Sequence, residues 1–98
     1  ELLCAEAIGL SDAGRAGFDL MDGRFDPGSD CPINLSGGLK AKGHPVGATG
    51  ASMHALAYKQ LTGQPIGVAA KQNPETAMTV NIGGSGVTNC VTVLRRIQ

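Results

Sequence analysis

The alternation of hydrophobic and polar positions predicts a helix at the start of the chain and another in its middle. Apolar residues recur at helical spacing in residues 1–10, at Leu3, Ala7 and Leu10. Residues 45–61 form the second predicted helix, because Pro45 suits a first helical position and apolar residues follow it. A Gly and a Pro at positions 63 and 65 are expected to end that helix.

The last third of the chain changes to a period of two, which predicts strands. Residues 77–82 alternate, and residues 87–94 place Val91 and Val93 on one face and Thr92 and Leu94 on the other. A glycine-rich turn, residues 83–86, separates the two runs. The sequence therefore predicts an antiparallel terminal β-hairpin and an α/β fold.

Residues 11–33 have no sustained period and are expected to form a solvated loop. Their acidic residues do not have the alternate spacing of a calcium loop. Together with residues 34–44, they give more than thirty residues with little predicted regular structure. So long a loop in so small a domain indicates function or a missing packing partner.

Composition adds a second reason to expect a packing partner. The chain has 98 residues, with fifteen glycines and only three aromatic side chains. Small domains with cores of small side chains are marginally stable. We therefore expect stabilisation by another part of the same protein, such as a missing N-terminal half, or by a partner subunit.

Charge and hydropathy exclude several classes of function. Eight basic and eight acidic residues balance, which argues against nucleic-acid binding or membrane-surface binding driven by bulk charge. No apolar run is long enough to span a membrane, and no signal peptide is visible. These features lead us to expect a cytoplasmic protein.

The three cysteines, Cys4, Cys31 and Cys90, are widely spaced and form no Cys-x-x-Cys pair. They are expected to be free thiols, with Cys90 a small core residue of a strand. His44, His54 and a cysteine have no known metal-ligand spacing, so no metal site is predicted. His54 is interpreted as a surface or interface histidine.

The stretch of residues 34–50 contains five glycines and, near its centre, His44. A P-loop needs Lys-Ser/Thr where His44-Pro45 stands, and the glycine gaps differ from a dinucleotide fingerprint. The remaining interpretation is a histidine at a helix N-terminus, where the dipole disfavours the imidazolium form. A neutral imidazole there can accept a thiol proton or donate a hydrogen bond to an oxyanion.

Two motifs in the chain resemble the thiolase family. One is Asn-Leu-Ser-Gly-Gly-x-x-Ala-x-Gly-His-Pro-x-Gly-Ala-Thr-Gly at positions 34–50, and the other is Asn-Ile-Gly-Gly-Ser-Gly at positions 81–86. Their order and the terminal hairpin agree with the end of that family's second half. The subgroup that the motifs resemble most is the sterol-carrier-protein-type, archaeal or lipid-transfer-protein thiolases. The resemblance implies that residues 1–98 form a partial thiolase C-terminal domain of helix, active-site loop, helix and hairpin.

The resemblance also implies an activity and roles for particular residues. Thiolases cleave 3-ketoacyl-CoA or condense acyl-CoA molecules through an acyl-cysteine, with the coenzyme A thioester as substrate and no separate cofactor. His44 matches the histidine that activates the cysteine, and Gly83 matches a glycine whose backbone N–H helps form an oxyanion hole. Gly43, Asn81 and Gly84 are expected to line the substrate. Thiolase-like proteins are usually oligomers, so a homo-oligomer is expected.

The sequence departs from the family pattern at two points. None of its cysteines lies in a motif that matches the nucleophile, so the isolated chain is expected to be inactive. Many thiolases have a catalytic cysteine where Asn81 stands. A non-catalytic thiolase-fold scaffold and a retro-aldolase-like relative therefore stay open as alternatives, as does a weaker one, a phosphate-binding module that uses Lys40 and Lys42.

Overall fold

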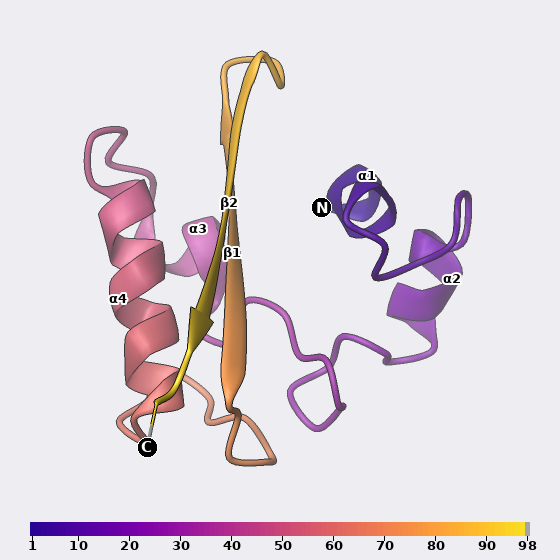
Figure 1. The fold of residues 1–98 in the computed structure, drawn as a ribbon. Helices are drawn as coiled ribbons and strands as arrows, with labels where there is room; N and C mark the ends of the chain where they lie inside the picture. Colours follow the sequence, from indigo (N-terminus) through magenta and orange to yellow (C-terminus); the bar gives the residue numbers. More distant parts are fainter. Residues whose placement is uncertain (98) are drawn as a thin grey trace. The chain divides into compact units, whose positions relative to one another are not determined.

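The computed structural model describes residues 1–97, which form two compact units. The first unit, Glu1–Ile33, contains two short helices, and the second begins at Asn34. The second unit holds two more helices and a two-stranded sheet (Figure 1). In chain order the elements are α1 (Leu2–Ala7), α2 (Ala16–Met21), α3 (Gly38–Lys42), α4 (Thr49–Leu61), β1 (Thr76–Gly83) and β2 (Thr88–Arg95).

The first unit corrects the expectation that residues 11–33 are a loop without regular structure, because α2 lies within them. Its core consists of Ala5, Ala16 and Phe25, with two partly buried residues packed against them, Leu10 and Ile33. Six residues are too short to show a helical period in the sequence. Packing of Ala16 in the core therefore stabilises a helix that the local sequence pattern does not predict.

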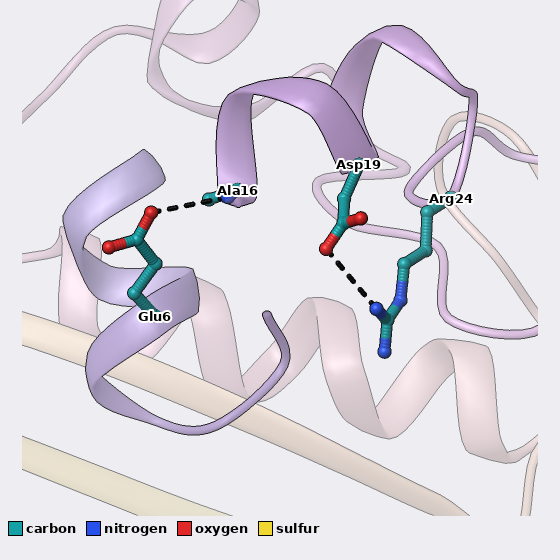
Figure 2. A network of polar contacts seen from close by, with 4 residues as sticks. All are labelled: Glu6, Ala16, Asp19 and Arg24. Atoms are coloured by element: carbon teal, nitrogen blue, oxygen red, sulfur yellow. Dashed lines mark hydrogen bonds and ion pairs between the residues drawn. The ribbon is translucent and has the colours of Figure 1, made fainter. Parts of the chain in front are cut away.

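A side chain from α1 completes the start of α2. The backbone N–H of Ala16 donates to Glu6 Oε1 at 3.2 Å, which satisfies a helix N–H that has no intrahelical partner (Figure 2). In the same unit, Arg24 Nη1 lies 3.2 Å from Asp19 Oδ2 in an exposed ion pair. The hydrogen bond joins residues ten positions apart, so no short-range sequence motif predicts it.

The second unit contains a short helix that was also not expected, since residues 34–44 looked irregular. This helix, α3, begins after Gly37, whose φ of +88° favours glycine, and ends at Lys42, before Gly43 with φ +78°. The next helix, α4, begins at Thr49 and not at Pro45. The N–H groups of Ala48 and Thr49 both donate to the Pro45 carbonyl, at 2.8 and 2.9 Å, so residues 45–48 form an irregular turn before the helix.

The predicted hairpin is confirmed: the first strand extends one residue further at each end than expected, and the second is shifted by one residue toward the C-terminus. Antiparallel pairing runs from Thr76 opposite Arg95 to Gly83 opposite Thr88. Val87 belongs to the turn and not to the second strand. Helix α4 packs against this hairpin, mainly along β1 (Figure 1).

The burial of side chains alternates, as the sequence predicts, only in the part of the hairpin away from its tip, at residues 76–79 and 91–95, whereas residues 81–83 and 88–90 are all exposed. Thr79 is buried, whereas the alternate positions along both strands leave an apolar face exposed, at Met78, Ile82, Val91 and Val93. In the described part of the second unit, Leu61 is the one buried hydrophobic residue. Among residues 1–97, no helix is long and apolar enough to cross a membrane.

Candidate functional site

His44 lies in the short connection between α3 and α4. Gly43, which directly precedes it, has φ +78° and ψ −178°, a backbone conformation that favours glycine and turns the chain out of α3. The His44 side chain is exposed, and its Nδ1 lies 2.7 Å from Thr49 Oγ1. The imidazole is therefore held through one nitrogen by the first residue of α4.

Thr49 is a buried anchor, with 4 % of its surface exposed. Its hydroxyl also donates a hydrogen bond to the Pro45 carbonyl at 3.1 Å. The residue was part of the motif in the sequence but received no role there. The signal that could have found it is a hydroxyl residue in the first helical turn, five positions after the histidine.

A second set of hydrogen bonds joins α3 to α4. Lys42 Nζ donates to Ser52 Oγ at 2.8 Å, and Ser52 Oγ donates to the Thr49 carbonyl at 2.8 Å. These hydrogen bonds connect residues on both sides of His44, and so hold the ends of the α3–α4 connection together. Because the ammonium of Lys42 already has a partner within the chain, this contact gives no support to the phosphate-binding hypothesis.

The second motif meets the first where β1 passes the start of α4. A Cβ atom at Gly50 would lie 2.8 Å from Asn81 Nδ2, so the amide of Asn81 occupies the space beside this glycine. Gly50 directly follows Thr49, the residue that holds His44. The Asn81 side chain on β1 therefore lies against the first turn of α4, which also contains Thr49, the residue that holds His44.

Gly83 and Gly84 lie at the tip of the hairpin. Gly83 is the last residue of β1, opposite Thr88, and a Cβ atom there would lie 3.1 Å from the Thr88 carbonyl oxygen. Gly84 has φ +60° and begins the turn. The close Thr88 carbonyl favours a small residue at position 83, and the positive φ favours glycine at position 84. The roles of Gly83, Gly84 and Gly43 at an oxyanion or a substrate stay predictions.

His54, the second histidine, lies on α4, where its Nδ1 donates to the Gly50 carbonyl at 2.7 Å. It lines an open groove of about 500 Å³ between α4 and the end of β2, together with Tyr58, Leu94 and Arg96. The geometry agrees with a surface histidine whose ring orientation is set by its own helix.

The cysteines are free, as expected, but the placement of Cys90 in the core is wrong. Cys4 and Cys31 are partly buried, whereas Cys90 is exposed. Cys90 pairs with Asn81 toward the hairpin tip, while the covered positions of β2 are Thr92 and Leu94. Within residues 1–97, no cluster of three histidine, cysteine or acidic side chains could hold a metal ion.

Comparison with known proteins identifies relatives over almost the whole chain. Residues 1–96 match the family model described as thiolase C-terminal domain-like. An acetyl-CoA acetyltransferase of Methanothermobacter thermautotrophicus is 41 % identical over 95 residues, which cover 97 % of this chain and 24 % of the relative. The benzoylsuccinyl-CoA thiolase subunit BbsB of Thauera aromatica is 38 % identical over 84 residues, which cover 86 % of this chain and 22 % of that subunit.

Sterol carrier protein 2 of Oryctolagus cuniculus is 40 % identical over 86 residues, which cover 88 % of this chain and 16 % of that protein. The chain thus spans a quarter or less of the length of these relatives. Both the archaeal and the sterol-carrier resemblance expected from the motifs are confirmed. From its two motifs, its hairpin and these relatives, the chain belongs to the thiolase C-terminal domain-like family.

Proposed function

We propose that this chain supplies the activating histidine and an oxyanion-hole loop to a thiolase-type acyl-CoA acyltransferase. The nucleophilic cysteine would come from a part of the enzyme outside residues 1–98, and acyl-CoA would enter as the substrate. The observation that supports the proposal is the meeting of the two motifs, with Asn81 against Gly50 beside the residue that holds His44.

In the proposed reaction, His44 takes the proton of the cysteine thiol, and the thiolate attacks the thioester carbonyl. The new carbon–sulfur bond forms as the carbonyl electron pair moves to oxygen. Hydrogen bonds from His44 and from the Gly83 backbone N–H would stabilise such oxyanions, and one donor of this kind contributes about 3 kcal/mol in a comparable enzyme. Collapse of the intermediate expels coenzyme A, which recovers the proton, and leaves the acyl-cysteine.

The position of Asn81 favours a second candidate, a thiolase-fold subunit without thiolase chemistry. An amide cannot exchange the proton that a cysteine would exchange at this position. A retro-aldolase-like relative would fit the same substitution. In both cases the motifs would bind an acyl-CoA without forming the acyl-enzyme.

The test uses the full-length protein that contains this chain, with acetyl-CoA labelled in the acetyl group. Covalent label after rapid quenching measures acylation in the unaltered protein, in His44→Asn and in the matched control His54→Asn. We expect His44→Asn to slow acylation by about 10²–10⁴-fold, the usual contribution of general acid–base catalysis. The His54→Asn variant should retain the original rate, since His54 bonds its own helix.

The results separate the candidates. An unchanged acylation rate in His44→Asn would show that His44 does not activate the nucleophile. Absence of covalent label in the unaltered protein, with acyl-CoA still bound in equilibrium dialysis, would favour the subunit without thiolase chemistry.

A further inference from the structure

The hydroxyl group of Thr49 lies between two partners of different hydrogen-bonding ability. On one side is the Pro45 carbonyl oxygen, 3.1 Å away, and on the other is His44 Nδ1, 2.7 Å away. A carbonyl oxygen can only accept, whereas a neutral imidazole nitrogen either donates or accepts according to its tautomer. Only two protons, one on the hydroxyl and one on the ring, are thus available for the contacts among the Pro45 carbonyl, the Thr49 hydroxyl and the His44 imidazole.

We propose that Thr49 fixes His44 in the tautomer that carries its proton on Nδ1, and so leaves Nε2 as the nitrogen that exchanges protons. The hydroxyl has one proton, and its contact with the Pro45 carbonyl requires that proton. Toward His44 the hydroxyl oxygen is therefore an acceptor, so Nδ1 must donate. The lone pair of the neutral ring is then on Nε2.

The opposite assignment leaves an unfavourable contact. If the hydroxyl donated to His44 Nδ1, two acceptor oxygens, those of Thr49 and Pro45, would face each other at 3.1 Å without a proton between them. The Pro45 carbonyl would keep the N–H groups of Ala48 and Thr49 as donors. The cost of the opposite assignment is therefore the lost hydrogen bond of the hydroxyl and the repulsion between the lone pairs of the two oxygens. The distances of both contacts, in contrast, fit ordinary hydrogen bonds in the proposed arrangement.

Thr49 can impose this choice because the structure fixes it while leaving His44 exposed. Its side chain is 4 % exposed, and its own N–H donates to the same Pro45 carbonyl at 2.9 Å. The hydroxyl oxygen consequently cannot turn away without losing its partly buried contact with the Pro45 carbonyl. A histidine exposed to solvent and without this partner would satisfy either nitrogen with water and populate both tautomers.

The functional consequence rests on the proposed acyltransferase activity. A lone pair on Nε2 can receive the thiol proton, and the resulting Nε2–H can then donate to an oxyanion, so one nitrogen serves both steps. Thr49 is a positioning residue in this scheme, because it acts only through the ring of His44.

The test is ¹⁵N NMR of the histidine rings in the full-length protein, labelled with ¹⁵N-histidine. His44→Asn identifies the signals of His44. His54 is an internal reference, since its Nδ1 faces the Gly50 carbonyl at 2.7 Å and must be protonated. We expect His44 to show the same pattern as His54, with a protonated Nδ1 and an unprotonated Nε2.

Two substitutions extend the test to the role of the hydroxyl. Thr49→Val keeps the shape but removes the acceptor, so His44 should become a mixture of tautomers. Acylation should slow by about 10–100-fold, the loss seen when hydrogen-bond partners of metal-binding histidines are removed. Thr49→Ser retains the hydroxyl and should restore both the spectrum and the rate.

A proton on Nε2 of His44 in the unaltered protein would overturn the inference, even if Thr49→Val failed to fold. An unchanged His44 spectrum in a folded Thr49→Val protein would overturn it as well. If the spectra are as expected while His44→Asn acylates at the original rate, the tautomer assignment holds and the proposed function fails.

Discussion

Substitution of Gly50 by alanine tests whether Asn81 lies against the first turn of α4. The new Cβ atom would lie 2.8 Å from Asn81 Nδ2, whereas non-bonded heavy atoms settle at about 3.5–4 Å. The amide must therefore retreat by about 0.7 Å or more, which an asparagine can do only by leaving its favoured rotamer or turning its amide.

Two opposing free-energy terms set the size of the effect. Replacing a helical glycine by alanine stabilises a helix by up to about 1 kcal/mol. Displacing the Asn81 side chain costs about 0.5–1.5 kcal/mol where χ1 must leave its rotamer, and less where the amide only turns about its broad χ2 torsion. In the unaltered background the two terms nearly cancel, but in an Asn81→Ala background only the gain remains. The expected coupling between the two positions is thus up to about 1.5 kcal/mol.

The assay is a double-mutant cycle in urea unfolding of the full-length protein, with Gly50→Ala and Asn81→Ala combined. Gly47→Ala is the matched control, because a Cβ atom at Gly47 meets nothing within 4 Å. Its effect should be the same in both backgrounds. Additive free energies for Gly50→Ala and Asn81→Ala would refute the packing of the Asn81 amide against Gly50.

Two further pairs of substitutions test the packing of each unit. Gly67→Ala should destabilise the protein by several kcal/mol in urea unfolding, since its Cβ atom would lie 2.5 Å from the Leu35 carbonyl oxygen; Gly63→Ala, which has a similar positive φ but open space, should cost only about 1–2 kcal/mol. Phe25→Ala should cost about 3–5 kcal/mol because Phe25 is buried in the first unit, and Phe18→Ala, at an exposed position, should cost well under half of that. Equal losses within either pair would contradict the packing described.

The elements that the sequence predicted are those whose signals are local. The hairpin follows from two alternating runs and the glycine-rich turn between them, and the end of α4 follows from Gly63 and Pro65. The thiolase resemblance depends on two contiguous motifs, which need no three-dimensional information. Each of these signals lies within fewer than twenty residues of sequence.

The features that the sequence did not predict depend on contacts between residues far apart in the chain, or on the positions of individual side-chain atoms. Helix α2 depends on Glu6, ten residues before the N–H group that it binds. The exposure of Cys90 depends on how far α4 reaches along the hairpin. The role of Thr49 depends on a hydroxyl that meets a ring nitrogen and a carbonyl at once, which residue types alone do not specify.

The hairpin of β1 and β2 also has a consequence for solubility. In the described residues the sheet has two strands of eight residues, so each strand has one edge without a neighbouring strand, and one face exposes Met78, Ile82, Val91 and Val93. Long apolar edge strands are templates for pairing with other chains. Residues 1–98 produced alone should therefore self-associate, and charged substitutions on that face, such as Val93→Lys, should keep the fragment in solution.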